Sequence, residues 1–367
     1  MRNNTALFFR NGALPVPRAV RMMRIADNMG YYCKFIGAKR EDLFSKKDQY
    51  DGFEVVRVGA KYPLLNGKRL FLYVVYTIFF TISLFLRFLK ERPALLVASD
   101  FEAIIPAIIY SKLFRTRLIY NIHDNISQRY NLPTVLNKIL NLLEGSAVKC
   151  CESSMVPEGF RRESLPKWCH HKVHIVRNVP ENVNYVKPDL ASDKIKIFYG
   201  GWLNPTRGIN ALIKLAEEND DFEVTIAGTG TSDMIKKLNS SDKLNFLGQI
   251  DHKSSLELTA NSHFIPIYYD PQIIINRYAA SNKLAETLAI GRPLLVNEEL
   301  VILESFYNKD SIIASAYSDF QSVPKKIREV FYNKDRYLKL CESSREIYEK
   351  HYSWDDAKLK MEQLIDY

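Results

Sequence analysis

The sequence has few cysteines and no spacing that would pair them. Its 367 residues include five, Cys33, Cys150, Cys151, Cys169 and Cys341, and none belongs to a Cys-x-x-Cys pair. A sparse, odd-numbered set is typical of reduced cytosolic thiols and argues against a disulfide framework. The first residues also lack the apolar stretch and small-residue cleavage site of a secretory signal, so we expect a cytoplasmic protein.

Several catalytic and metal-binding motifs are also missing. The chain has no Asp-x-Asp, no Walker A loop, no His-Glu-x-x-His and no Gly-x-Ser-x-Gly. Their absence argues against P-loop, zincin and α/β-hydrolase chemistry. The run from Cys169 to His174 contains adjacent histidines, but neighbours in a strand face opposite ways, so we predict no metal site there. We expect neither a metal nor a cofactor.

The composition is that of a soluble globular protein, with an uneven distribution of charge. Hydrophobic residues make up 47% of the chain and charged residues 25%, and the formal net charge is +9. Residues 1–186 carry 28 basic and 15 acidic side chains, whereas residues 187–367 carry 23 and 27. Disorder and coiled coil are therefore excluded as the main architecture, and the basic half is expected to face an anionic partner.

Short apolar strands alternate with helix-like stretches along most of the chain. We predict strands over residues 6–9, 32–36, 53–58, 94–98, 117–122 and 172–176, then 194–199, 222–227, 244–247, 264–268, 293–296 and 311–314. Helices are expected at 18–29, 209–218, 234–238, 254–260, 282–290, about 320–349 and 355–365. This order predicts an α/β protein with two Rossmann-like, doubly wound parallel-sheet domains and a ligand site in the cleft between them.

Polar residues after Asn178-Val179-Pro180 suggest where the two domains meet. We assign residues 1–186 to an N-terminal domain that faces the acceptor or membrane, and 187–350 to a C-terminal domain that binds the donor. Residues 351–367 form a C-terminal helix for which the N-terminal domain is one available packing partner.

One apolar run within the first domain is unusually long. Leu70–Leu86 contains no charged residue, and basic residues flank it on both sides. As a helix it would extend about 26 Å, slightly less than the roughly 30 Å hydrocarbon core of a bilayer. Three interpretations remain open: a membrane span, a buried helix, and a helix that packs on the domain while dipping into the membrane interface. The basic flanks favour the last.

The segment Ser281–Pro293 is the strongest local candidate for a binding site. Ser281 suits a helix N-cap, Gly291 suits the residue after the helix, and Pro293 ends it. The free N–H groups at the N-terminus of this helix, together with Lys283, would attract a phosphate, and Glu286 would accept hydrogen bonds from a sugar. The alternative is an ordinary capped helix with a surface Lys–Glu pair.

Loops after other predicted strands carry further candidates. Arg207 lies in a glycine-rich loop that includes Gly201, where it could grip a phosphate. A second loop, Gly228-Thr229-Gly230, is an incomplete dinucleotide motif and equally well a tight turn. His123 follows the strand at 117–122, a position that favours a functional role. Asp100 and Glu102 follow the strand at 94–98, where they either serve an acceptor hydroxyl or cap the next helix.

The order of these motifs resembles a known family. Segments 201–208, 224–230, 246–248, 281–286, 291–293 and 352–354, with 121–124 and 176–178 more loosely, are similar to the retaining glycosyltransferases of the GT-B fold, especially glycosyltransferase family 4. Coverage is nearly the whole chain. Single motifs are weak, but their order and spacing are specific.

The resemblance implies a nucleotide-sugar donor held mainly by the second domain, without a metal. Implied catalytic residues are His123, Arg207, Lys283 and Glu286; implied donor-binding residues are Gly12, Gly201, Arg207, Gly228, Ile250, Ser281, Asn282, Lys283 and Glu286; Asp100 and Glu102 would serve the acceptor. Two positions depart from the family pattern. Trp202 replaces a basic residue, and Tyr278 replaces a glutamate near the donor sugar.

The resulting hypothesis is a retaining glycosyltransferase of bacterial surface polysaccharide synthesis, of the capsule or O-antigen type. Its partners would be a nucleotide sugar, a saccharide or lipid-pyrophosphate-linked acceptor and the inner face of the cell membrane, with no nucleic acid. Two alternatives remain: a nucleotide-sugar epimerase of the same fold, and a degenerate protein that binds nucleotide sugars without turnover.

Overall fold

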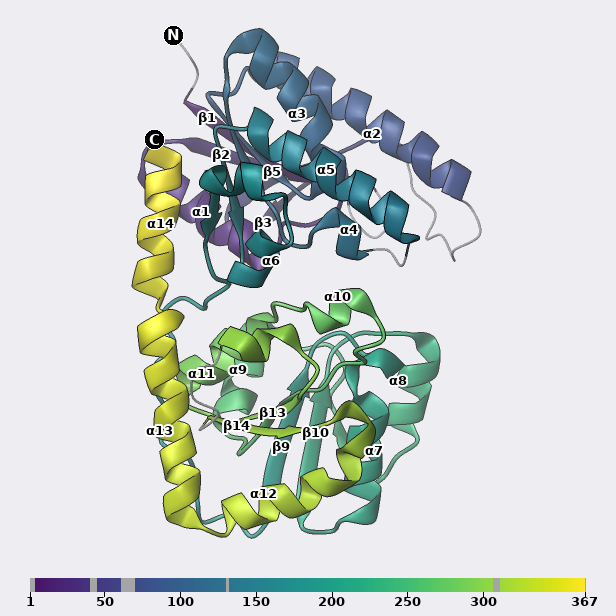
Figure 1. Cartoon of the computed structure of the whole chain (residues 1–367), viewed down its shortest axis with the longest axis vertical. Coiled ribbons are helices and arrows are strands. Elements are labelled where there is room, and N and C mark those ends of the chain that lie inside the picture. The colour runs from purple at the N-terminus through teal and green to yellow at the C-terminus, as the bar shows by residue number, and fades with distance from the viewer. Residues whose placement is uncertain (1–3, 40–44, 61–69, 130–131, 306–310, 367) are drawn as a thin grey trace. The chain divides into compact units, whose positions relative to one another are not determined.

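The computed structural model describes residues 4–39, 45–60, 70–129, 132–305 and 311–366 (Figure 1). The chain divides into two compact units. Unit 1 comprises Met1–Arg177 and Ala357–Tyr367, and unit 2 comprises Asn178–Asp356. Each unit is an α/β body with its own strands and its own hydrophobic core.

Unit 1 is built on an eight-stranded sheet. Its strands are β1 (Thr5–Arg10), β2 (Tyr32–Ala38), β3 (Lys47–Tyr50), β4 (Phe53–Val58), β5 (Leu95–Ser99), β6 (Arg117–Asn121), β7 (Ser153–Val156) and β8 (Val173–Ile175). The order is β3-β4-β2-β1-β5-β6-β7-β8, and every pairing is parallel except that of β3 with β4. Six of these strands are confirmed predictions; the sequence analysis missed β3 and β7.

Helices lie between the strands of unit 1. They are α1 (Pro17–Asn28), α2 (Leu70–Glu91), α3 (Phe101–Phe114), α4 (Ile126–Arg129), α5 (Thr134–Cys150), α6 (Gly159–Glu163) and the 3-10 helix η1 (Lys167–Lys172). The C-terminal helix α14 (Trp354–Asp366) belongs to unit 1 from Ala357 onward. The Arg117 side chain donates hydrogen bonds to the carbonyls of Leu364 and Ile365, so the strand β6 holds the C-terminal end of α14. A cation at that end also suits the helix dipole.

The helix α2 covers the apolar run of the sequence. Phe80, Leu84 and Phe88 are buried in the core of unit 1, whereas Ile78 and Ile82 are about half exposed. The helix is therefore packed on the domain along one side, and apolar side chains also line its outer side. Within the described ranges, no helix combines the length and apolarity needed to cross a membrane.

Unit 2 contains two parallel three-stranded sheets. Their strands are β9 (Ile195–Gly200), β10 (Phe222–Ala227) and β11 (Asn245–Phe246), in the order β11-β10-β9, and β12 (Ile265–Ile267), β13 (Leu294–Asn297) and β14 (Ile312–Ser315), in that order. A parallel bridge between Ile197 and Phe264 joins them along a narrow seam from β9 to β12. All six predicted strands of this half are confirmed, and β10 has the predicted bounds.

The helices of unit 2 flank these strands. They are α7 (Ile209–Glu218), α8 (Ser232–Asn239), α9 (His252–Ala260), α10 (Ile274–Arg277), α11 (Asn282–Ile290), α12 (Val323–Phe331) and α13 (Lys334–His351), with 3-10 helices η2 (Pro205–Arg207), η3 (Val301–Ser305) and η5 (Tyr317–Ser322). The bounds of α7 and α11 match the predictions. The loop before β13 is anchored by Arg292, whose buried guanidinium donates to the backbone carbonyls of Val186, Ala260 and Ser262.

Candidate functional site

The loop after β9 places Arg207 beside the end of β12. The Asn204 side chain caps η2 by accepting from the Thr206 amide at 2.9 Å, and the Thr206 carbonyl accepts from the Asp270 amide at 2.9 Å. Gly208 follows with a φ of +72°, and a Cβ there would lie 2.5 Å from the Tyr268 carbonyl oxygen. Only glycine fits this close approach without strain, so the loop is held against the neighbouring strand end.

The helix α11 begins next to this loop. Ser281 has the extended backbone of an N-cap residue, but its hydroxyl makes no capping hydrogen bond and instead accepts from the Tyr269 hydroxyl at 3.4 Å. Gly291 ends the helix with a φ of +78°, as predicted. The first amides of α11 therefore have no side-chain cap from Ser281, and the helix N-terminus remains available to an anion.

Lys283 and Arg207 meet two tyrosines in unit 2. The Lys283 ammonium lies 3.6 Å from the centre of the Tyr199 ring, and the Arg207 guanidinium carbon lies 4.3 Å from that of Tyr269. Burial and the charge of Arg207 lower the pKa of Lys283. Burial alone would raise the pKa of Tyr269, but Lys283 and Arg207 outweigh it and lower that pKa. The positive charges of Lys283 and Arg207 thus dominate the electrostatics of this site.

No carboxylate of the described residues makes a direct ion pair with either cation. Within the described residues, Arg207 and Lys283 form no ion pair with an Asp or Glu side chain. Glu286 does not pair with Lys283 as the alternative interpretation of α11 would require. It is buried, and its Oε1 lies 2.9 Å from Nε2 of His252, the first residue of α9. Two neighbouring cations without a carboxylate in direct contact favour the binding of an anion.

The predicted glycines bring two loops of unit 2 together. The Gly201 amide donates to the Ala227 carbonyl at 2.9 Å, and a Cβ on Gly228 would lie 1.8 Å from the Gly201 carbonyl oxygen. A Cβ on Gly201 would itself lie 3.1 Å from the Lys283 ammonium. The loops after β9 and β10 thus pack backbone to backbone, and Lys283 lies over them.

The remaining predicted donor contacts are near the ends of elements. Ile250 is half-buried in the loop before α9, and Asn282 is half-buried as the first residue of α11. Gly12 belongs to unit 1, in the loop after β1, where its carbonyl accepts from the Ala38 amide at 3.1 Å and a Cβ would meet the Arg10 side chain at 2.9 Å.

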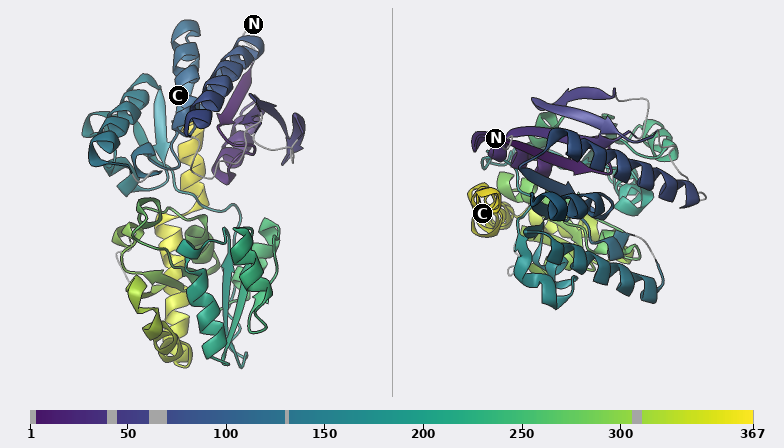
Figure 2. Two further views of the ribbon diagram at one scale, coloured as in Figure 1. Left: turned by 90° about the vertical axis from the view of Figure 1, so that its right-hand side faces the viewer. Right: turned by 90° about the horizontal axis from the view of Figure 1, so that it is seen from above.

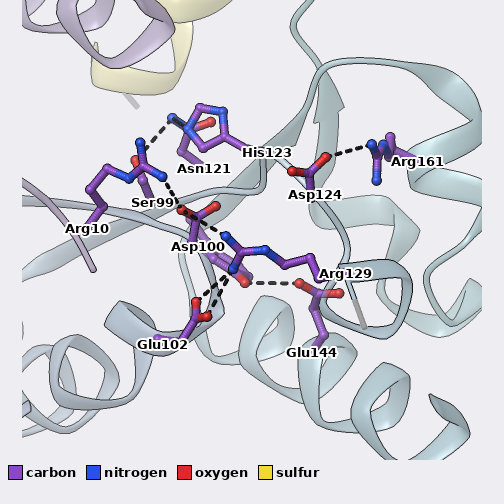
Figure 3. A network of polar contacts seen from close by, with 11 residues as sticks. Arg10, Ser99, Asp100, Glu102, Asn121, His123, Asp124, Arg129, Glu144 and Arg161 are labelled. Carbon is purple, nitrogen blue, oxygen red and sulfur yellow. Dashed lines mark hydrogen bonds and ion pairs between the residues drawn. The ribbon is translucent and has the colours of Figure 1, made fainter. Parts of the chain in front are cut away.

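A polar network occupies the corresponding edge of the sheet in unit 1 (Figure 3). His123 follows β6, and its Nε2 lies 3.2 Å from Nδ2 of Asn121. Because an amide nitrogen donates, Nε2 accepts and the proton of the neutral ring is on Nδ1. Burial, with the charges of Arg18 and Arg10, holds the pKa of His123 well below its ordinary value. The imidazole is therefore neutral and offers Nδ1–H as a donor.

Asp100 and Glu102 are both engaged by arginines. Asp100 is buried, with a φ of +70°, and its carboxylate lies 3.2 Å from Arg10 and 3.7 Å from Arg129. Glu102 forms an ion pair with Arg129 at 2.9 Å. Asp100 occupies the N-cap position of α3 but makes no capping hydrogen bond. A left-handed backbone at a non-glycine residue costs energy and is often found at functional sites.

The sequence analysis did not single out the arginines of the network in unit 1 or the two tyrosines beside Arg207 and Lys283 in unit 2. Arg18 is buried, donates to the carbonyls of Ile122 and Val176, and has a pKa lowered to about 9 by burial and Arg21. Arg161 pairs with Asp124 at 2.7 Å. For Arg18, the sequence offered one indication of a functional role, which is that this arginine lies on the apolar side of the helix predicted at residues 18–29. Among the described residues, no cluster of His, Cys, Asp and Glu has the arrangement of a metal site.

Comparison with known proteins identifies the fold. No protein-family profile matches the chain, and no curated protein is significantly similar in sequence. Similar solved structures include a sucrose-phosphate synthase from Thermosynechococcus elongatus, with 12% identity, a TM-score of 0.77 and 98% of each chain covered. Anabaena HepE in complex with UDP-glucose has 13% identity, a TM-score of 0.71 and 99% of each chain covered. WaaG, a glycosyltransferase involved in lipopolysaccharide biosynthesis, has 13% identity, a TM-score of 0.64 and covers 98% of this chain and 99% of its own. The chain has the GT-B fold, as predicted.

Proposed function

We propose that the protein is a retaining glycosyltransferase that uses a nucleotide-diphosphate sugar. The observation that carries this proposal is the pair Arg207 and Lys283 in unit 2, which converge without a carboxylate partner beside the N-terminus of α11. Two cations and a helix N-terminus are the groups that bind a diphosphate. The solved structures of the same fold support the donor class, since one of them is a complex with UDP-glucose.

The same groups account for stabilisation of the leaving group. As the bond from the anomeric carbon to the diphosphate breaks, negative charge develops on the leaving oxygen, which Arg207, Lys283 and the α11 amides stabilise. The acceptor hydroxyl attacks from the same face, and its proton passes to the leaving diphosphate. Glu286, held by His252 at 2.9 Å, keeps its other oxygen for the hydroxyls of the nucleotide ribose. Front-face attack retains the configuration at the anomeric carbon.

Unit 1 offers hydrogen-bonding groups of its own for saccharide hydroxyls. The neutral His123 has its Nδ1–H as a donor for a sugar hydroxyl. Asp100 and Glu102 are held by Arg10 and Arg129, so they act as fixed hydrogen-bond acceptors for an acceptor hydroxyl. The strained backbone of Asp100 supports a functional assignment for this edge of the sheet.

The acceptor that we propose is a saccharide linked to a lipid pyrophosphate at the inner face of the cell membrane. The excess of basic residues in the first 186 residues and the apolar outer side of α2 support this choice. WaaG, which has the same fold, is involved in lipopolysaccharide biosynthesis. The pathway would be assembly of a surface polysaccharide, such as a capsule or an O-antigen.

Calorimetric titration with UDP-glucose and a panel of other nucleotide sugars tests the donor site. Arg207→Ala and Lys283→Ala should each weaken binding about 10-fold to 150-fold, because each removes a charge-assisted contact of about 1.5–3 kcal/mol. Lys253→Ala is the control, since this lysine of unit 2 is largely exposed. Unchanged affinity in both site variants would show that the diphosphate binds elsewhere.

The fate of the bound sugar separates the proposal from its alternatives. A glycosyltransferase transfers the sugar, or hydrolyses it slowly, with the anomeric configuration retained in the nuclear magnetic resonance spectrum. An epimerase inverts a different carbon, and a degenerate protein binds without turnover, an outcome that Tyr278 at the family's glutamate position would explain. Because Arg207 and Lys283 supply the positive charge, we expect transfer to survive a chelator. Loss of transfer with EDTA and recovery with a divalent ion would refute this.

A further inference from the structure

The outer sides of α2, α3 and α5 hold most of the exposed large apolar side chains of the described chain. Of 25 such side chains, 15 lie on these three helices of unit 1. They are Val74, Ile78, Phe79, Ile82, Leu86, Leu89, Ile105, Ile109, Leu113, Phe114, Val135, Leu136, Ile139, Leu142 and Leu143. We call this set the three-helix face. Single exposed apolar residues are ordinary, but such a concentration marks a binding surface.

The exposed side chains form stripes along the helices. On α2 they recur every four residues from Val74 to Leu86, and on α3 they recur at Ile105, Ile109 and Leu113. The opposite sides of the same helices are buried in the core, as Leu84 and Ala107 illustrate. These helices are therefore apolar on both sides, which a helix at a water-exposed surface normally is not.

The three stripes belong to one continuous surface. The helix α3 packs against both α2 and α5, and the view from above shows α2, α3 and α5 in a row, dark blue through teal (Figure 2). Next to them, η1 packs against α5 and carries Trp168, whose side chain is 46% exposed. Tryptophan is enriched at the boundary between lipid and water.

The exposed charges on the three helices and the segments between them have one sign. Between residues 70 and 150 the exposed charged side chains are all basic: Lys90, Arg92, Lys112, Arg115, Lys138 and Lys149. None of the five acidic residues in this range is exposed. Lys90 and Arg92 lie at the C-terminal end of α2, and Lys112 and Arg115 lie at that of α3. The basic groups thus gather mainly where these helices end.

We propose that the three-helix face binds the surface of an anionic lipid bilayer. The apolar stripes would enter the boundary between head groups and acyl chains, and the basic residues would contact anionic head groups. A second copy of this chain is a poorer occupant, because two such faces would bring like charges together. The inference deepens the proposed function and rests on it for the acceptor, since it names the surface on which a lipid-linked acceptor lies.

Flotation of the full-length protein with vesicles of equal phosphatidylglycerol and phosphatidylcholine tests the proposal. The diagnostic variant carries Ile105→Ser, Ile109→Ser, Val135→Ser and Ile139→Ser, which leaves α2 intact. We expect its partition onto these vesicles to fall at least about 100-fold relative to wild type. The control carries Tyr332→Ser and Leu359→Ser, at positions 62% and 54% exposed but outside the face, and should float like wild type.

A charge variant separates head-group attraction from apolar insertion. Lys112→Gln with Arg115→Gln should weaken binding about 25-fold at low salt, because each basic residue contributes about fivefold near an anionic surface. The difference should disappear at high salt or on pure phosphatidylcholine. The diagnostic and charge variants should keep the thermal unfolding midpoint and the UDP-glucose affinity of wild type, because their substituted side chains are exposed and belong to unit 1.

Three results would overturn the inference. They are wild-type protein that stays unbound on anionic vesicles at low salt, a diagnostic variant that floats like wild type, and a wild-type dimer in sedimentation that the diagnostic variant dissociates. Failure of the proposed function would appear differently, as wild-type protein that floats but binds no nucleotide sugar.

Discussion

Replacing Glu144 by glutamine should change how the stability of unit 1 depends on pH. The Glu144 side chain is fully buried in α5, where one oxygen contacts the Tyr120 hydroxyl at 3.1 Å and the other accepts from the Ile126 amide at 3.0 Å. Burial raises the pKa of this carboxyl to about 8, although both hydrogen bonds and the nearby Arg129 oppose the shift. Figure 3 shows Arg129 beside it. The folded protein therefore holds a proton at neutral pH that the unfolded chain releases.

The sign and size of the effect follow from this difference. Below about pH 4.5 both states are protonated, so no penalty applies. As the pH rises toward 8, the unfolded state loses its proton and the folded state keeps it, so stability falls. The full shift from 4.5 to about 8 corresponds to roughly 5 kcal/mol. Glutamine preserves the shape and both hydrogen bonds without titrating, so Glu144→Gln should gain about 3–5 kcal/mol over wild type between pH 5 and pH 8.5.

Urea unfolding monitored by Trp168 fluorescence measures this effect. Trp168 belongs to unit 1, so replacing Trp202 and Trp354 by phenylalanine in every variant makes the signal specific to that unit. Glu257→Gln is the control, since this glutamate is largely exposed and should keep the wild-type pH dependence. A Glu144→Gln variant whose stability runs parallel to wild type from pH 5 to pH 8.5 would show that Glu144 is ionised in the folded protein.

Three further predictions follow from contacts in the two units. Gly208→Ala should destabilise unit 2 by about 1–3 kcal/mol in thermal unfolding, because alanine is strained at a φ of +72° and its Cβ would clash with the Tyr268 carbonyl oxygen. The same clash would displace the neighbouring Arg207 and weaken UDP-glucose binding. An unchanged unfolding midpoint would contradict this. Arg292→Met should cost about 3 kcal/mol or more in urea, since it leaves buried carbonyls without a donor; a loss below 1 kcal/mol would exclude the anchoring role. His123→Asn should reduce the loss of stability between pH 7.5 and pH 5, because burial keeps the folded imidazole neutral while the unfolded one takes up a proton below about pH 6.5; an identical pH profile would refute the buried neutral imidazole.

The sequence predicted the elements whose signals are local. The bounds of α11 follow from Ser281, Gly291 and Pro293, and those of β10 follow from a compact apolar run. The strand β3 has no such signal, because its four residues are polar and exposed and its pairing is antiparallel at the edge of the sheet. The buried β7 was missed because it begins with two serines.

The site was predictable where residues follow parallel strands, and not where it depends on register. Arg207 was expected because it lies just before a predicted helix, in the loop after a strand, and Lys283 because it lies in the first turn of a predicted helix. The pairing of Arg10 with Asp100 depends on the register that places Arg10 opposite Ser99 across β1 and β5. Tyr199 and Tyr269 follow apolar runs and have the pattern of core residues. Only the folded chain shows that they contact the two cations.

The narrow seam between β9 and β12 has a consequence for amide exchange. The Lys283 ammonium contacts Tyr199 of β9, and the Arg207 guanidinium contacts Tyr269, which follows β12. The two cations therefore contact residues on both sides of the Ile197–Phe264 bridge. An anion that binds both cations would connect the two three-stranded sheets across this single bridge. Local separation of β9 from β12 would then require release of the anion. Hydrogen–deuterium exchange at the Phe198 amide, which donates to the Phe264 carbonyl at 3.4 Å, should therefore slow in proportion to ligand concentration above the dissociation constant. The exchange rate of this amide would then measure occupancy of the diphosphate site directly, without any turnover.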